Sequence, residues 1–376
     1  MKKFVFVSLN NIPWGGSEYL WNLTARNFLD NGYEVEASVA KVAQLPVKIA
    51  ELQQEGGIIH KRQWIPLSAL QQRLNRLLPL PRQFKPRFNA YDILNGSKPA
   101  LVVFSQGANF EGVEWMEECI KRNIPYVTVC QAVTELIWPD DAMCERAARV
   151  LEASRKNYFV SKANLRLMQT LIAQPIPNGE VIRNPFNVPY HSDFEFPPVE
   201  DTYKLANVAR HQIGIKGIEL FLQVLSDTKW QQRPLQVNMY GEGMHTRTIE
   251  KMLGFFGLTN VFVRGQQNTV DIWKENHALL LTSRFEGLPL ALVEAMLCGR
   301  TSIVTAVSGI PEVVVDNENA FVAKYPSVEE IDEALERAWQ RKDDWEQMGR
   351  NAKTYIKSLV PEDPIQIFYE NLLLLV

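Results

Sequence analysis

Short apolar runs alternate with longer amphipathic segments along this chain of 376 residues. In the first half, the runs that read as buried strands are Phe4–Val7, Val35–Ala40, Leu101–Phe104, Tyr126–Val129 and Tyr158–Val160. Between the first two, Ser17–Asp30 has the spacing of an amphipathic helix, with Gly32 near its expected end. Because buried strands that alternate with helices form parallel sheets covered on both faces, the pattern predicts an α/β fold.

A proline-rich stretch divides the chain and predicts a linker. Six prolines fall between Pro175 and Pro198. A second series of strand-like runs follows, at Leu205–Ala209, Val237–Tyr240, Val261–Val263, Ala278–Leu281, Ser302–Thr305 and Ala320–Ala323. The tail 328–375 is helical in pattern and is interrupted by Pro361 and Pro364. We therefore expect two doubly wound, Rossmann-like domains, at 1–185 and 186–358, and a C-terminal helix at 359–376 that packs back on the first domain.

Composition sets the class of protein. A net charge of −3 gives no reason to expect a nucleic-acid partner, and 46% hydrophobic residues argue against disorder. The four cysteines form no CxxC pair, which favours a reducing compartment. The apolar run after Met1 stops at Asn10, too early for a signal peptide, and no run approaches the roughly 18 residues of a spanning helix. We expect a cytoplasmic protein, which can also lie peripherally at the cytoplasmic face of the membrane.

The strongest chemical signal is the segment 279–300, in which Glu286 and Glu294 stand eight residues apart. A strand is expected to end near Thr282, and Pro289 suits the first turn of a helix. The free N–H groups of that turn would form an anion site. Glu294 has apolar neighbours, so its burial is costly without partners. Glu294 is either a structural carboxylate held by backbone groups or by an arginine, or a group that accepts hydrogen bonds from sugar hydroxyls. Glu286, taken alone, could be an acidic residue whose charge interacts favourably with the helix dipole.

Other candidate binding residues follow other strands. Arg210 comes after one strand, and Lys216 precedes the next helix, an arrangement that suits a diphosphate or, alternatively, two surface cations. Gly241 and Gly243 follow another strand and permit close approach of the backbone to a ligand. Ligands bind at the carboxyl ends of strands in such folds, so a cleft between the two domains is the expected site.

The first loop carries Gly15 and Gly16 between the first strand and the first helix. These glycines can bring backbone N–H groups to a phosphate. The loop contains neither the dinucleotide-binding GxGxxG pattern nor a P-loop.

Together these segments resemble the retaining glycosyltransferases of GT-B fold, in the large family 4 that shares an E-x7-E element. The resemblance covers nearly the whole chain. The segments that carry it are residues 15–18, 104–107, 160–163 and 181–185 in the first half of the chain. In the second half they are Arg210 with 216–217, residues 240–243, the stretch from 286 to 296, and residues 308–312.

The resemblance implies roles for the donor-side residues. Arg210 and Lys216 would hold the diphosphate of the donor and stabilise the leaving nucleotide. Glu286 would bind the donor hexose and Glu294 the ribose hydroxyls. The remaining donor-binding residues would be Gly15, Gly16, Gly241, Gly243, Gly287, Leu288 and Pro289, of which Pro289 has no N–H to donate.

On the acceptor side the candidates are Glu18, Gln106 and Gln131. Gln131 occupies a place where many relatives carry a histidine, and Gln106 likewise replaces a frequent histidine. Glutamine can form hydrogen bonds but does not titrate near neutral pH.

The expected reaction needs no metal and no cofactor, and it retains the anomeric configuration. No Asp-x-Asp follows a strand, and Asp140-Asp141 reads as a turn or a helix cap. Fixed cations and helix N–H groups can stabilise a departing diphosphate. The substrates would be a UDP-, GDP- or ADP-sugar and a glycan, lipid-linked or other hydroxyl acceptor. Two alternatives stay open: a nucleotide-sugar epimerase of the same fold, and a non-catalytic nucleotide-sugar or glycan-binding protein.

A cationic stretch lies in the first domain. From Gly56 to Tyr91 there are seven lysines and arginines and no acidic residue, with leucines at helical spacing. Residues 60–88 could form an amphipathic helix on an anionic membrane surface, or a helix packed on the sheet with a solvated basic edge.

Overall fold

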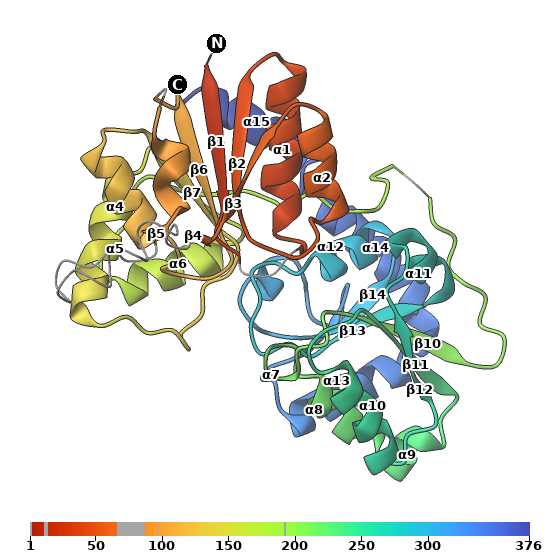
Figure 1. Cartoon of the computed structure of the whole chain (residues 1–376). Helices are drawn as coiled ribbons and strands as arrows, with labels where there is room; N and C mark the ends of the chain where they lie inside the picture. The colour runs from red at the N-terminus through yellow and green to blue at the C-terminus, as the bar shows by residue number, and fades with distance from the viewer. Residues whose placement is uncertain (1, 11–13, 66–86, 97, 192) are drawn as a thin grey trace, which may run out of the picture. The chain divides into compact units, whose positions relative to one another are not determined.

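The computed structural model describes residues 2–10, 14–65, 87–96, 98–191 and 193–376. The chain forms two compact units (Figure 1). The first unit contains residues 1–159, 165–184 and 365–376, and the second contains 160–164 and 185–364. We describe each unit by itself.

The first unit is built on a parallel sheet of seven strands in the order β3-β2-β1-β6-β7-β8-β9. Its strands are β1 (Lys3–Ser8), β2 (Glu34–Ala40), β3 (Ile58–Arg62), β6 (Leu101–Gln106), β7 (Tyr126–Cys130), β8 (Lys156–Phe159) and β9 (Gly179–Val181). Both faces are covered, as β1 shows: Phe4 and Phe6 pack into one apolar layer, and Val5 and Val7 into the opposite one. This is why the β1 sequence is continuously apolar rather than alternating.

Helices cover both faces of this sheet (Figure 1). They are α1 (Glu18–Asp30), α2 (Val47–Gln54), α4 (Val113–Lys121), α5 (Asp141–Ala153), α6 (Lys162–Leu171) and α15 (Pro364–Leu373), with the short 3-10 helix η2 (Ala90–Leu94). Helices α1, α2 and α15 share the layer of Phe4. The ring of Tyr369 on α15 lies 4.7 Å from that of Phe28 on α1. Pro364, which reads in the sequence as an interruption, is instead the first residue of α15.

A two-stranded antiparallel pair, β4 (Trp64–Ile65) with β5 (Arg87–Phe88), follows β3 in the chain. Most of the cationic stretch 60–88 lies between these strands. Residues 66–86 lie outside the described part of the chain, so the structure does not test the helix expected there.

The second unit has a parallel sheet of six strands in the order β12-β11-β10-β13-β14-β15. The strands are β10 (Tyr203–Val208), β11 (Leu235–Tyr240), β12 (Val261–Gly265), β13 (Ala278–Leu281), β14 (Thr301–Thr305) and β15 (Phe321–Ala323). Its helices are α7 (Ile213–Lys216), α8 (Ile218–Leu225), α9 (Thr228–Gln231), α10 (Thr246–Phe255), α11 (Thr269–Glu275), α12 (Leu290–Leu297), α13 (Val328–Gln340) and α14 (Trp345–Lys357), with η3 (Ile310–Glu312) and η4 (Lys342–Asp344). Alternate residues of β13 again face opposite layers.

Each sheet has a switch point where its strand order reverses. In the first unit it lies between β1 and β6, and in the second between β10 and β13. In open α/β sheets, ligands bind at the carboxyl edge beside such a switch point, because the loops that follow the two central strands diverge there.

The two Rossmann-like α/β units and the helical tail expected from the sequence are confirmed. Two smaller expectations differ in detail: α12 begins at Leu290, with Pro289 as its N-cap rather than in its first turn, and β10 ends one residue before Ala209. The helix-cap interpretation of Asp140 is confirmed, since its carboxylate accepts the N–H of Met143 at 2.7 Å. All four cysteines belong to the described residues, and all are free thiols.

Candidate functional site

An ion pair at the switch point of the second sheet joins two of the predicted site residues. Lys216, the last residue of α7, follows β10, and Glu286 lies in the loop after β13. The Lys216 Nζ atom is 2.6 Å from Glu286 Oε1. The Ser283 hydroxyl donates to the same oxygen at 2.6 Å. Both charged groups are largely buried, so their charges are held in place rather than left to solvent.

The turn that carries Lys216 is fixed against the strand that carries Glu286. Gly217 adopts a left-handed φ of 58°, and a Cβ atom there would lie 2.1 Å from the carbonyl oxygen of Thr282. The hydroxyl of Thr282 donates to the Gly217 carbonyl at 2.9 Å, and the N–H of Arg284 donates to the Ile215 carbonyl at 2.8 Å. Only glycine permits this close approach of the two backbones.

The loop from Glu286 to α12 is also held on its other side. The Ser308 hydroxyl accepts the N–H of Glu286 at 3.1 Å, and the Gly309 N–H donates to the Gly287 carbonyl at 3.0 Å. Leu288 and Pro289 are buried at the start of α12. The first N–H groups of a helix have no intrahelical acceptors, so this end of α12 can receive an anion.

Arg210 lies at the same edge of the second sheet, directly after β10, and its side chain is exposed. The glycines after β11 allow that loop to approach it. Gly241 has φ 128°, and a Cβ atom there would lie 2.2 Å from the Ala209 carbonyl oxygen. A Cβ atom on Gly243 would lie 2.6 Å from the His211 carbonyl oxygen. The structure therefore places Arg210, Lys216, Gly241, Gly243 and Glu286 after three neighbouring strands at one carboxyl edge.

Glu294 lies on the buried side of α12 and is only 4% exposed. Its Oε1 atom accepts two bonds from Asn187, from the backbone N–H and from the side-chain amide, each at 2.9 Å. Burial raises the pKa of Glu294 to about 7, while the two Asn187 donors act in the opposite direction. The two Asn187 donors give Glu294 the partners that a structural carboxylate needs. Its other oxygen, Oε2, stays available to accept a bond from a ligand.

The acceptor-side candidates Glu18, Gln106 and Gln131 belong to the first unit: Gln106 ends β6, Gln131 follows β7, and Glu18 begins the helix after β1. Glu18, at the start of α1, is buried and accepts the Trp21 indole N–H at 2.7 Å. Burial raises the pKa of Glu18, and hydrogen bonds partly offset that effect. Gly15 and Gly16 lie in the turn before α1, where the Gly15 carbonyl accepts the Glu18 N–H at 3.0 Å.

The two glutamines are buried and oriented by hydrogen bonds. The Gln106 amide donates to the Glu111 carbonyl at 2.6 Å, whereas its own Oε1 is buried without a partner among the described residues. The Oε1 atom of Gln131 accepts the Asn184 amide at 2.6 Å, and its Nε2 donates to the Ser17 carbonyl at 3.4 Å. In the described structure, these residues therefore form a group of neutral donors and acceptors rather than a titrating one.

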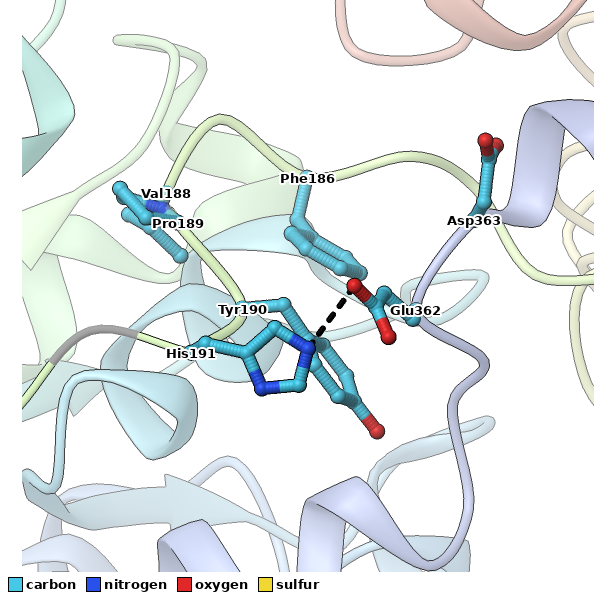
Figure 2. A pocket seen from close by; sticks show the side chains of 7 residues that line it. All are labelled: Phe186, Val188, Pro189, Tyr190, His191, Glu362 and Asp363. Atoms are coloured by element: carbon cyan, nitrogen blue, oxygen red, sulfur yellow. Dashed lines mark ion pairs between the residues drawn. The ribbon is translucent and has the colours of Figure 1, made fainter.

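One surface hollow lies apart from these residues. Figure 2 shows the side chains that line it: Phe186, Val188, Pro189, Tyr190, His191, Glu362 and Asp363. An ion pair of 2.8 Å joins His191 and Glu362, both of which are largely exposed. None of the predicted site residues lines this hollow.

Sequence reasoning missed several residues of the site. Asn187 is the partner of Glu294 although 107 positions separate them, and no spacing rule connects the two. Ser283 and Ser308 bind Glu286, but serines near strand ends are too common to stand out. Among the described residues, no group of three potential metal-ligating side chains is found, and no described helix is long and apolar enough to cross a bilayer.

Comparison with known structures identifies the fold class. A crystal structure of Anabaena HepE in complex with UDP and glucose superposes with a TM-score of 0.75 at 15% identity, covering 99% of each chain. The fold is therefore that of the GT-B glycosyltransferases.

Sequence comparison finds similarity to glycosyltransferases over part of the chain. Residues 192–355 match the family described as glycosyl transferases group 1. One subunit of the human phosphatidylinositol N-acetylglucosaminyltransferase is 29% identical over 186 residues, 48% of this chain and 37% of that protein. The Staphylococcus aureus (strain COL) poly(ribitol-phosphate) alpha-N-acetylglucosaminyltransferase is 26% identical over 133 residues, 35% of this chain and 27% of that protein. The similarity thus spans less than half the length of these curated relatives. The match to the glycosyl transferases group 1 model lies within the second unit.

Proposed function

We propose that this protein is a retaining, metal-independent glycosyltransferase that moves a hexosyl group from a nucleoside-diphosphate sugar to a hydroxyl acceptor. The observation that carries the proposal is the ion pair of Lys216 and Glu286 at the switch point of the second sheet, beside the start of α12. A cation, a carboxylate and free helix N–H groups at one sheet edge suit a ligand that combines a diphosphate with a sugar.

The chemistry follows from where charge develops. As the bond from the anomeric carbon to the phosphate breaks, negative charge grows on the oxygens of the leaving nucleotide. Lys216 and Arg210, with the N–H groups at Gly287, Leu288 and the first turn of α12, would stabilise that charge. Such preorganised groups stabilise the transition state without reorganising. They also supply the charge compensation that a divalent cation gives in other enzymes.

Glu286 can serve Lys216 and the sugar together. Its Oε1 atom accepts hydrogen bonds from Lys216 and Ser283, so Oε2 is the oxygen that would accept a bond from a hydroxyl of the donor sugar. An ammonium group has three N–H donors, so Lys216 can hold Glu286 and still reach a phosphate. The ion pair therefore keeps both groups in place for the donor.

Glu294 would accept the ribose hydroxyls. Asn187 occupies only Oε1, and ribose hydroxyls are donors that favour the ionised carboxylate. Gly16 of the first unit would contact the diphosphate. Glu18, Gln106 and Gln131 would bind the acceptor through neutral hydrogen bonds or, for Glu18, through a buried carboxyl group.

The relatives indicate where a donor screen should start. Both curated relatives are named as N-acetylglucosaminyltransferases, and the HepE structure contains UDP and glucose. UDP-N-acetylglucosamine and UDP-glucose are therefore the first donors to test, before GDP- and ADP-sugars.

The test measures nucleotide release from each donor, with and without acceptor glycans, and in the presence of EDTA. We expect UDP release that survives EDTA, and a product whose anomeric configuration by NMR matches that of the donor. Donor isomerisation without nucleotide release would instead identify an epimerase, and donor binding without turnover would identify a binding protein. Loss of activity in EDTA that added metal restores would contradict metal independence.

A further inference from the structure

The tight turn between β14 and η3 carries a serine in a backbone conformation that glycine normally adopts. The Ile310 N–H donates to the Val307 carbonyl at 3.0 Å, which closes a four-residue turn around Ser308 and Gly309. The φ angles of these two central residues are 49° and −79°. A positive φ followed by a negative one is typical of a type II′ turn, in which glycine is the usual residue at the first central position.

The glycine of this turn stands at the other central position, for a different reason. The φ of Gly309 is one that any residue adopts, but there is no space for a side chain. A Cβ atom on Gly309 would lie 2.5 Å from the Gly287 carbonyl oxygen and 2.7 Å from the Cβ atom of Ser161. Ser161 belongs to residues 160–164, which are part of the second unit. The turn therefore keeps a side chain at the position where glycine would relieve strain.

The side chain at the strained position has a specific partner. The Ser308 Oγ atom accepts the N–H of Glu286 at 3.1 Å. In the same turn, the Gly309 N–H donates to the Gly287 carbonyl at 3.0 Å. Two successive residues of the turn thus hold two successive residues of the Glu286 loop. The Glu286 carboxylate is fixed separately, by its ion pair with Lys216.

Further bonds keep the turn in this conformation. The Ala306 N–H donates to the carbonyl of Ala323 on the neighbouring strand β15 at 2.9 Å. The carboxylate of Glu312, at the end of η3, accepts the N–H groups of Ala163 at 2.7 Å and Lys162 at 3.1 Å. A strained φ persists only where the surrounding contacts determine the backbone from several sides. These bonds on both sides of Ser308 do so.

The strain at Ser308 opposes folding, so the contacts of its side chain show what it contributes. Ser308 is half-buried, and the N–H of Glu286 is the one hydrogen-bond partner of its hydroxyl among the described residues. Residues with strained backbones cluster at functional sites, where the strain fixes a geometry that the site needs. The group fixed by Ser308 is the residue expected to bind the donor sugar.

We propose that Ser308 is a positioning residue: its hydroxyl holds the backbone of Glu286 so that the carboxylate stands where the hydroxyls of the donor hexose bind. This inference rests on the proposed function, in which Glu286 binds that hexose. Ser308 acts through Glu286 and needs no contact with the donor. The nucleotide would be held by other groups, Arg210 and Lys216 among them, so Ser308 should matter for the sugar more than for the nucleotide.

The test compares Ser308→Gly and Ser308→Ala with wild type, in the full chain. Both substitutions remove the hydroxyl, but only glycine also relieves the strain. With UDP-glucose or UDP-N-acetylglucosamine, whichever the donor screen selects, kcat should fall by about fivefold or more in both variants, because a small displacement of Glu286 misplaces the sugar. KM for the donor should change less. The melting temperature of Ser308→Gly should nevertheless lie above that of Ser308→Ala.

Ala173→Gly is the matched control. Ala173 also has a left-handed φ, of 52°, but it is exposed and lies two residues after α6. Glycine there relieves the same kind of strain without removing a polar group, so kcat should stay unchanged and the melting temperature should not fall. Calorimetry with UDP gives a second readout. UDP contains no hexose, so all four proteins should bind it with equal affinity.

Three results would overturn the proposal. The first is wild-type kcat in Ser308→Gly. The second is a kcat that follows the melting temperature across the variants, because the serine would then serve stability alone. The third is a loss of UDP affinity in both Ser308 variants, because the turn would then support the nucleotide site as a whole. Failure of the proposed function is a different observation: wild type itself would release no nucleotide from any donor of the screen, and the role of Ser308 would fail with it.

Discussion

The ammonium group of Lys216 lies 2.6 Å from the carboxylate of Glu286, across 70 positions of sequence. The two residues follow β10 and β13, which are neighbours in the sheet although β11 and β12 separate them in the chain. The reversal of strand order thus brings a cation and an anion together at the edge where a ligand binds.

Replacing Lys216 by alanine should lower the rate of nucleotide release by about tenfold or more, because the developing phosphate charge loses a fixed cation. The measurement is kcat and KM with the best donor of the screen. Lys229→Ala is the matched control, since Lys229 also forms an ion pair, with Asp332 at 2.7 Å, but lies on α9. Equal losses in both variants would contradict a specific role of Lys216.

Glu294→Gln should change how stability depends on pH. Burial raises the pKa of Glu294 from 4.5 to about 7, so its contribution to stability is full below pH 4.5 and is lost as the pH rises through 7. Glutamine does not titrate, so between pH 5 and 8 the melting temperature of wild type should fall relative to that of the variant. Parallel curves for the two proteins would show that Glu294 ionises normally.

The same carboxyl group should couple nucleotide binding to pH. Ribose hydroxyls donate to the ionised form, so UDP affinity of wild type should rise between pH 6 and 8. In Glu294→Gln that rise should be absent. Calorimetry in two buffers of different ionisation enthalpy measures the proton released on binding; no difference between wild type and variant would place the ribose elsewhere.

Gly217→Ala should destabilise the second unit and reduce activity. The left-handed φ of 58° and the 2.1 Å approach to the Thr282 oxygen would strain any Cβ atom, at a cost of about 1–3 kcal/mol. Gly254→Ala is the control, because a Cβ atom there meets no atom within 4 Å on helix α10. Denaturant unfolding should show a loss for the first substitution and a neutral or positive change for the second.

Arg284→Lys tests whether the Lys216 turn is positioned by its neighbours. The Arg284 side chain pairs with Glu219 at the start of α8 and reaches the Ile213 carbonyl at 3.4 Å. Lysine keeps the charge but cannot span both partners, so kcat should fall several-fold while KM for the donor changes little. Glu219→Gln should likewise lower kcat while leaving KM for the donor nearly unchanged. A loss confined to KM would mean that Arg284 contacts the donor directly.

The sequence predicted the fold well because buried strands and amphipathic helices leave a regular pattern. Phe4–Val7 and Ala278–Leu281 are apolar throughout because each strand is covered on both faces. Residues that follow strands were also identifiable, since parallel strands bring their carboxyl ends to one edge. Lys216 and Glu286 are in contact there, and Arg210 follows β10 at the same edge.

What could not be predicted depends on contacts between distant segments. Glu294 stood out as a carboxylate in an apolar helix, but nothing in the sequence identifies Asn187 as its partner. Nothing in the sequence indicates that the consecutive apolar residues Leu136, Ile137 and Trp138 are exposed, as the structure shows them to be. The role of Glu294 in donor binding stays a prediction, which the experiments above test.

The linker between the units is anchored close to both sets of candidate residues. Asn184, in the first unit, holds Gln131, and Asn187, in the second unit, holds Glu294. Only Pro185 and Phe186 separate these anchors. A nucleotide that binds the other carboxylate oxygen of Glu294 would share this residue with Asn187, so the donor site would be joined through one carboxylate to the covalent connection that leads to Gln131.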